Sequence, residues 1–254
     1  MPASLPPLRI GCAGWSIPRQ HAHHFPRGAS VLQRYAQVFD AVEINATFYR
    51  TPRAATFQRW AESVPEGFRF SLKLPRTLTH YARLRDPEAG LDAFFACAAP
   101  LGEKLGAVLA QLPPTLAWDP DTAEHFFAAL RVRVGEHVVV ACEPRHASWA
   151  DRPVAALLGR HRVARVAADP PRFEVDALPS GTRPAYWRWH GSTRVYYDAY
   201  EDARLAILAD ALRADPGAWA IFDNTAHGHA TNDALRLRAM LAPGAASHSG
   251  RGLA

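Results

Sequence analysis

Short hydrophobic runs alternate with longer amphipathic segments along most of the chain. Eight of these runs are rich in apolar and β-branched residues and are bounded by turn residues, which is typical of β-strands that are buried on both faces. The predicted strands cover residues 8–15, 41–48, 68–74, 107–112, 137–145, 163–169, 185–191 and 218–224.

Helix signals fill almost every interval between these strands. Two segments open with an N-cap residue followed by proline at the first helical position, Thr51 before Pro52 and Asp119 before Pro120. The sixth strand is followed instead by a proline-rich segment, which predicts that the helix there is missing or irregular. The predicted helices cover residues 30–39, 51–62, 91–99, 119–130, 152–161, 203–214 and 231–241.

Strands separated by helices indicate parallel βαβ units. Eight such units over 254 residues predict an α/β fold of the TIM type, a closed (β/α)8 barrel with parallel strands. An open doubly wound sheet is the alternative, but no GxGxxG motif follows the first strand. We expect one barrel domain over residues 8–243, with disordered tails at residues 1–7 and 244–254.

The composition is typical of soluble globular proteins. Hydrophobic residues make up 48% of the chain and charged residues 21%. The longest apolar runs fall far short of the roughly 20 residues that span a bilayer, and the N-terminus lacks the features of a secretory signal. We therefore expect a cytoplasmic protein without membrane contact, while the oligomeric state stays open.

Net charge and cysteine content change this picture only slightly. The net charge of +5 makes a nucleic-acid partner possible. However, the 29 basic residues are spread along the chain, and all except Lys73 and Lys104 are arginine. The three cysteines include no CxxC pair, so we expect reduced thiols at Cys12, Cys97 and Cys142.

Polar or ionisable residues occur near the ends of seven consecutive strands. Side chains alternate along a strand, so residues two apart share a face, as Glu143 and Arg145 do in VVVACEPR. In a parallel barrel this face would point inward at the carboxyl ends of the strands, where barrel enzymes have their active sites. An ion-paired interior layer, or strands that turn polar as loops begin, are the alternatives. The other residues of this pattern are Glu43, Asn45, Lys73, Gln111, Asp169, Arg188, His190 and Asp223, with Asn224 beside the last.

The balance of charges bears on the chemistry of this predicted site. Four carboxylates face three fixed cations, with His190 as a possible fourth, so the set nearly balances without a metal. We therefore expect no metal and no cofactor. The cations suggest an anionic ligand, phosphorylated or carboxylated, because a planar arginine fork matches such groups.

The predicted catalytic residues are those that can move protons or attack a substrate. Glu143 and His190 are candidates for proton transfer, since a desolvated carboxylate and an imidazole both titrate near neutrality when perturbed. Lys73 is a base, a Schiff-base amine or a structural ammonium paired with Glu143, and Asp223 completes the set. The predicted substrate-binding residues are Arg145, Arg188, Glu43, Asn45, Gln111, Asp169, Asn224, Trp149 and Tyr197.

Two loops and one histidine segment have a second interpretation. The loops after the seventh and eighth strands, HGSTR and DNTAHGH, offer amides and hydroxyls at Gly191, Ser192, Thr225 and Gly228 that suit a phosphate. Ordinary turn chemistry accounts for the same residues. The HAHH segment at residues 21–24 lies before the first helix, and we expect it to be exposed rather than a set of metal ligands.

Seven motifs along the chain together resemble one family, in order and in spacing. They are GCAGWS (11–16), VEINATFYRTP (42–52), FRFSLKLPRTLTH (68–80), LGAVLAQLPP (105–114), CEPRHASW (142–149), WRWHG (187–191) and FDNTAHGHATNDALRL (222–237). They resemble the YecE-like family, catalogued as domain of unknown function 72. The resemblance implies a TIM-type barrel but no established reaction. Its motif residues include His80 and His146 besides the predicted site.

This chain departs from the family pattern at Pro144 and Ala147, where the family usually has an aromatic residue and a proline. We expect an enzyme, a hydrolase or a lyase, that acts on an anionic small molecule by acid/base chemistry. A nucleic-acid-binding or nuclease-like barrel and a scaffold without catalysis are the alternatives, because a fold does not determine a function.

Overall fold

The structure is a computed structural model that describes residues 7–173 and 185–242. Its eight strands are parallel and neighbour one another in the order β1-β8-β7-β6-β5-β4-β3-β2. A bridge between Ala13 and Glu43 brings the two end strands together, so the sheet is a nearly closed barrel, as predicted. The strands are β1 (Arg9–Cys12), β2 (Ala41–Ile44), β3 (Arg69–Lys73), β4 (Leu105–Gln111), β5 (Val139–Glu143), β6 (Val163–Asp169), β7 (Tyr186–Trp189) and β8 (Trp219–Phe222).

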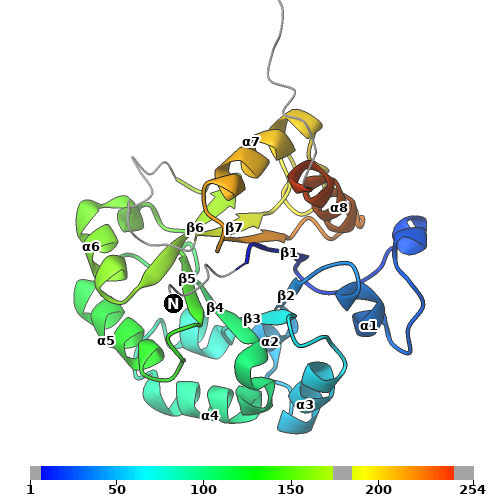
Figure 1. The fold of residues 1–254 in the computed structure, drawn as a ribbon. Coiled ribbons are helices and arrows are strands. Elements are labelled where there is room, and N and C mark those ends of the chain that lie inside the picture. The colour runs from blue at the N-terminus through cyan, green and yellow to red at the C-terminus, as the bar shows by residue number, and fades with distance from the viewer. Residues whose placement is uncertain (1–6, 174–184, 243–254) are drawn as a thin grey trace, which may run out of the picture.

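Helices surround the strands on the outside of the barrel (Figure 1). The segment between β6 and β7 is the one predicted to lack a regular helix, and its described residues, 170–173 and 185, are not helical. Residues 174–184 lie outside the described residues. The same holds for residues 1–6 and 243–254, which include most of the two predicted tails. The α-helices are α1 (Val31–Ala36), α2 (Ala46–Tyr49), α3 (Ala54–Glu62), α4 (Glu88–Ala98), α5 (Pro120–Arg131), α6 (Arg152–Arg160), α7 (Asp202–Arg213) and α8 (His229–Leu241), and the short turns are η1 (Arg19–His24), η2 (Thr77–Tyr81), η3 (Ala99–Lys104) and η4 (Ala147–Ala150).

None of the helices in residues 7–173 and 185–242 combines the length and the apolar character that a membrane crossing needs.

Strand β2 is shorter than the sequence predicts. The predicted strand extends to residue 48, but β2 ends at Ile44 and α2 begins at Ala46. The Thr47 hydroxyl donates to the carbonyl oxygens of Ile44 and Lys73, each 2.7 Å away. This side chain therefore ties together the carboxyl ends of β2 and β3, and the turn into α2 brings Phe48 over the barrel mouth.

The seam between β1 and β2 depends on one buried tyrosine. The Cys12 N–H donates to the Tyr35 hydroxyl (2.8 Å), which in turn donates to the Ala41 carbonyl oxygen (3.0 Å). The two strands also approach closely, because a Cβ atom at Gly11 would lie only 2.0 Å from the Ala41 oxygen. The hydroxyl thus replaces strand-to-strand hydrogen bonds where the barrel closes.

The interior of the barrel has an apolar floor beneath a polar layer. Tyr186 and Trp219 fill the centre with rings 5.9 Å apart, against small residues of the other strands such as Ala107 and Ala141. The Tyr186 hydroxyl is 2.9 Å from Glu43 Oε2 and donates to it. This hydroxyl therefore marks the level at which the interior changes from apolar packing to charged side chains.

Replacing Tyr35 by phenylalanine should lower the free energy of unfolding by about 1–3 kcal/mol, because the buried N–H of Cys12 and the carbonyl of Ala41 would each lose a partner. Urea denaturation followed by circular dichroism measures this change. Tyr81→Phe is the matched control, because Tyr81 is 65% exposed. Equal effects of the two substitutions would contradict this account of the seam.

Candidate functional site

Seven of the predicted site residues converge inside the barrel at the carboxyl ends of its strands. Each lies at or close to the end of its strand, and all are buried, with exposed fractions from 0% for Arg188 to 8% for Lys73. We call them the mouth cluster: Glu43, Lys73, Gln111, Glu143, Arg188, His190 and Asp223.

Arg188 is the centre of the mouth cluster. Its guanidinium donates to both oxygens of Glu43 (Nη2–Oε1 2.8 Å, Nε–Oε2 2.9 Å), to Glu143 Oε2 (2.8 Å) and to Asp223 Oδ2 (2.9 Å). Burial alone would lower the pKa of Arg188, but the three carboxylates raise that pKa well above its usual value. Its donors are used within the protein and its exposed fraction is 0%, while the ligand contact of Arg188 stays a prediction.

His190 lies between two carboxylates. Its Nε2 is 3.1 Å from Glu143 Oε1, and its Nδ1 is 3.0 Å from Asp223 Oδ2. Both carboxylates are acceptors, so this arrangement is best satisfied when both ring nitrogens carry a proton. Burial works to lower the pKa of His190, but the hydrogen bonds to Asp223 and Glu143 outweigh burial and raise that pKa.

Glu143 accepts hydrogen bonds at both carboxylate oxygens. Gln111 donates to Oε2 (2.9 Å), as does Arg188, while Arg145 donates to Oε1 from Nη2 (3.2 Å) and Nε (3.3 Å). Burial alone would raise the pKa of Glu143, but Arg188 and His190 hold it well below its usual range. The expectation that the Glu143 carboxyl titrates near neutrality is therefore wrong.

Lys73 differs from the other charged residues of the mouth cluster. Its Nζ makes no hydrogen bond or ion pair with any residue in the described part of the chain, so the alternative of a structural pair with Glu143 is not found. The Nζ lies 4.4 Å from the centroid of the Phe48 ring. Burial and the charge of Arg188 lower the pKa of Lys73 to about 8, against the opposing effect of the nearby carboxylates.

Arg145 and Asn45 lie at the edge of the mouth cluster. Arg145 also donates from Nη2 to the Tyr196 hydroxyl (3.4 Å), and its side chain is 16% exposed. Asn45 donates from Nδ2 to Asp223 Oδ1 (3.2 Å), while its buried Oδ1 has no hydrogen-bond partner. Both residues therefore retain hydrogen-bonding capacity, and their predicted ligand contact stays a prediction.

Asp169 lies outside the mouth cluster, contrary to the prediction. It has the outward parity at the end of β6, where its carboxylate accepts hydrogen bonds from Arg204 of α7 (Nη2–Oδ1 2.8 Å, Nε–Oδ2 3.3 Å). The inward positions of β6 are small and apolar: Ala164, Val166 and Ala168. Arg165 and Asp169 thus share the outward face of β6, and the position of Asp169 at the strand end does not by itself reveal this.

Two other predicted binding residues have structural partners instead. The Trp149 indole N–H donates to the Leu116 carbonyl oxygen (3.0 Å), and this side chain is 1% exposed. Asn224 donates to Asp233 Oδ2 (2.8 Å) and is 0% exposed. Tyr197, by contrast, is 43% exposed in the loop after β7, so its predicted ligand contact stays open.

Three residues that contact the site were absent from the predicted set. Ser71 and Tyr186, joined by a 2.8 Å hydrogen bond between their hydroxyls, each lie two residues before a predicted site residue on the same strand. The alternation rule could therefore have found both. The rings of Tyr196 and His190 form an edge-to-face contact, with their centroids 5.8 Å apart. The backbone of Tyr196 has a positive φ of +73°. Tyr196 is one of the aromatic residues that gather near the strand ends in the sequence, but strand alternation cannot place it, because a loop brings it to the site.

The glycine loops after β7 and β8 agree with the interpretation as turns. The Gly191 N–H donates to the Tyr200 hydroxyl (2.8 Å), and the Gly228 N–H donates to the Thr225 carbonyl oxygen (3.1 Å). Both glycines have positive φ, +102° and +80°. Their amides are thus engaged within the protein rather than directed at a phosphate.

The HAHH segment forms the short turn η1, in which His23 and His24 are exposed with rings 3.9 Å apart. Within residues 7–173 and 185–242, no group of three or more histidine, cysteine, aspartate or glutamate residues is arranged to hold a metal ion.

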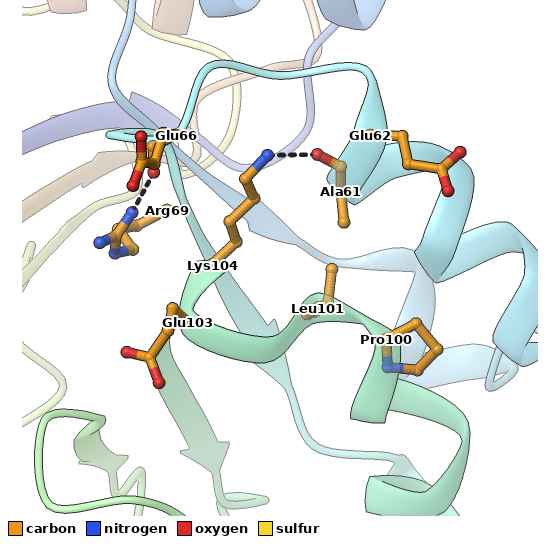
Figure 2. A pocket seen from close by; sticks show the side chains of 8 residues that line it. All are labelled: Ala61, Glu62, Glu66, Arg69, Pro100, Leu101, Glu103 and Lys104. Atoms are coloured by element: carbon orange, nitrogen blue, oxygen red, sulfur yellow. Dashed lines mark hydrogen bonds between the residues drawn. The ribbon is translucent and has the colours of Figure 1, made fainter.

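A surface hollow of about 460 Å³ lies at the opposite end of the barrel, where β3 and β4 begin (Figure 2). In Figure 2 the Lys104 side chain reaches across this hollow toward Ala61. Its Nζ donates to the carbonyl oxygens of Ala61 and Val64, the latter at 2.8 Å. Because the amino-terminal face of such barrels usually contributes stability, we assign this lysine a structural role.

Residues 9–251 match the model of the family described as "Protein of unknown function DUF72". The chain belongs to this family. The UPF0759 protein YecE of Escherichia coli (strain K12) is 35% identical over 108 residues, and the UPF0759 protein YunF of Bacillus subtilis (strain 168) is 32% identical over 157 residues. These matches span 42% and 58% of this chain but only 38% and 53% of the relatives' lengths.

Solved structures of DUF72 proteins share the barrel. A protein from Thermotoga maritima matches with a TM-score of 0.74 and 26% identity, covering 92% of this chain and 98% of its own. A protein from Enterococcus faecalis matches with a TM-score of 0.75 and 23% identity, covering 93% and 98%. The DUF72 description assigns no reaction, so the site has to be interpreted from its own geometry.

The raised pKa of His190 predicts a specific dependence of stability on pH. A protonated His190 stabilises the fold fully below the unfolded pKa of about 6.5, and this contribution is lost as the pH rises through the higher folded pKa. His190→Gln should therefore lower the free energy of unfolding more at about pH 6 than at about pH 9.

Urea denaturation at both pH values measures this difference. The control is His125→Gln, because His125 and its partner Glu88 have side chains 59% and 46% exposed and such pairs contribute little. A loss of stability in His190→Gln that does not change with pH would show that His190 is not charged in the folded protein.

Proposed function

We propose that this DUF72 protein is an enzyme that acts on an anionic small molecule, phosphorylated or carboxylated, by acid/base chemistry at the carboxyl-terminal mouth of its barrel. The observation that carries the proposal is the environment of Lys73. It is a buried cation without a partner among the described residues, beside carboxylates that Arg188 already satisfies. An anionic group of a ligand would supply the missing partner.

The balance of charges at the mouth also favours an anion. Asp169, which lies outside the mouth cluster, does not contribute to it. Three carboxylates therefore face three fixed cations and a histidine whose pKa is raised, which leaves one excess positive charge when His190 is protonated. These groups are Glu43, Glu143 and Asp223 against Lys73, Arg145, Arg188 and His190.

The proposed binding groups are the side chains at the mouth whose hydrogen-bonding or charge capacity is not used up within the protein. Arg145 and Lys73 hold the anion, and the free Oδ1 of Asn45 accepts a hydrogen bond from a hydroxyl or amine of the ligand. Gln111 orients the Glu143 carboxylate. Glu43 and Arg188, both 0% exposed, position the other side chains instead of touching the ligand.

His190 is the proposed proton donor and acceptor. Glu143 and Asp223 fix both nitrogens of its ring and favour the protonated form, which suits a general acid. After it has given up its proton, the same imidazole can serve as a base for the return step. A hydrolase or a lyase can use such a pair of proton transfers, and the two transfers themselves need no cofactor.

Anion binding tests this proposal directly. Isothermal titration with inorganic phosphate and with oxalate should detect binding to the parent protein. Lys73→Met and Arg145→Met should each weaken it about tenfold, equivalent to roughly 1.4 kcal/mol, because each removes one charge contact. The matched control is Arg152→Met, an exposed arginine at the start of α6. Unchanged binding in both site variants would refute the assignment.

A second candidate function rests on the exposed tyrosines around the mouth. Arg76 packs against Tyr49 and Tyr81 at 5.5 and 5.4 Å, and Arg194 packs against Tyr197 at 4.8 Å. Tyr49 and Tyr81 are 69% and 65% exposed. Such arginine and tyrosine pairs can stack on the bases of a single-stranded nucleic acid.

Retention on an oligonucleotide column at low salt, and its loss as salt rises, would support this second function. Replacing Tyr49 and Tyr81 together by serine should then reduce retention, whereas Tyr35 is buried and plays no part in such a surface. A protein that passes through the column at low salt would exclude the nucleic-acid function.

A further inference from the structure

We propose that Lys73 forms a Schiff base with a carbonyl group of the substrate, which would therefore be an aldehyde or ketone that also carries a phosphate or carboxylate. The inference rests on the proposed function for the anionic group, while the covalent step is independent of it. The evidence is the placement of Lys73, its lack of partners and the groups around it.

The two lysines of this chain have opposite environments. Lys104 Nζ is held by the carbonyl oxygens of Ala61 and Val64 at the amino-terminal end of the barrel. Lys73 Nζ has no such acceptor within the described residues, and it lies over the ring of Phe48 at the other end. A lysine that stabilises the fold is expected to be held as Lys104 is. Lys73 is buried without this compensation, at the end where barrel enzymes react.

The surroundings of Lys73 favour its neutral, nucleophilic form. Burial is the largest influence, and the positive charge of Arg188 acts in the same direction, so the pKa of Lys73 is about 8. The carboxylates that would restore the positive charge are already bound to Arg188. At about pH 7.5 the fraction of free amine is then on the order of 100-fold higher than for a lysine with the usual pKa of about 10.4.

The covalent step balances without any further reactant. The ammonium of Lys73 first releases a proton to solvent, and the amine lone pair then attacks the carbonyl carbon. The carbonyl oxygen takes up a proton to give a carbinolamine. Loss of water leaves a carbon–nitrogen double bond, so one amine and one carbonyl yield one imine and one water.

The other groups at the mouth suit the steps around such an imine. A protonated imine withdraws electrons from the adjacent carbon, so a proton or a carbon–carbon bond there becomes easier to break. His190, held by Glu143 and Asp223, is the group that would move this proton. Arg145, whose side chain is 16% exposed at the edge of the mouth cluster, is the cation that remains for the anionic group.

Reductive trapping tests the inference. The full chain is incubated at about pH 7.5 with sodium cyanoborohydride and either pyruvate or dihydroxyacetone phosphate, and peptides are analysed by mass spectrometry. Only two lysines compete, and we expect the reduced adduct on Lys73 to form at least about tenfold faster than on Lys104. The rate should rise as the pH passes through about 8.

Lys73→Arg is the main control, because it keeps the positive charge and removes the nucleophilic amine. This variant should give no adduct in the 73 region. Acetone and dihydroxyacetone, the neutral counterparts of the two probes, should give adducts on Lys73 at least about tenfold more slowly. A thermal melt of the variant, compared with the parent protein, confirms that it is folded.

The outcomes separate the two proposals. Phosphate binding without any Lys73 adduct, or adducts on Lys104 and the N-terminal amine at the same rate as on Lys73, would overturn the Schiff base and leave the anion site standing. Lys73 adducts that form equally fast with neutral and anionic carbonyls would support the Schiff base and overturn the anion site.

Discussion

A single guanidinium organises the interior of this barrel. Arg188 reaches from β7 to the carboxylates of Glu43 on β2, Glu143 on β5 and Asp223 on β8, all buried. An unpaired buried carboxylate is costly, so Arg188 stabilises all three, while Glu143 and Asp223 also pair with His190. Because the partner strands lie on different sides of the barrel, the network also constrains how the ring closes. The apolar floor of Tyr186 and Trp219 supports the network from below.

The same network determines which charges are left over. Although both carboxylates are bound to Arg188, Glu143 and Asp223 also accept hydrogen bonds from His190 and raise its pKa. No carboxylate of residues 7–173 and 185–242 forms an ion pair with Lys73, whose Nζ lies over the Phe48 ring. The mouth thus combines a hydrogen-bonded interior with a buried amine that has no partner among the described residues and a partly exposed arginine at its edge. Both proposals rest on this contrast between side chains that have hydrogen-bond partners within the protein and side chains that lack them.

Comparison with relatives establishes the family and supports the barrel fold, but it assigns no reaction to the site. The DUF72 structures share the barrel at 26% and 23% identity, and the curated relatives align over part of their length. A barrel of this kind hosts many reactions, because its active sites are built from a few side chains at the strand ends. The residues at the mouth therefore have to be interpreted from their contacts.

The sequence by itself determined the barrel and the membership of the mouth cluster. The order of strands and helices follows from short-range periodicity, and the alternation of side chains identified Glu43, Lys73, Glu143 and Arg188 as inward-facing. The prediction failed at Asp169, which shares the outward face of β6 with Arg165, because the face that points inward depends on pairing with β7.

Only the tertiary structure decided which charges neutralise one another. The sequence left Lys73 as either a partner of Glu143 or a free amine, and it treated Arg188 and Arg145 as equal. Distances between atoms on different strands settled both questions, since a salt bridge depends on separations of a few ångströms that no local pattern encodes. The loop that brings Tyr196 to His190 was decided in the same way.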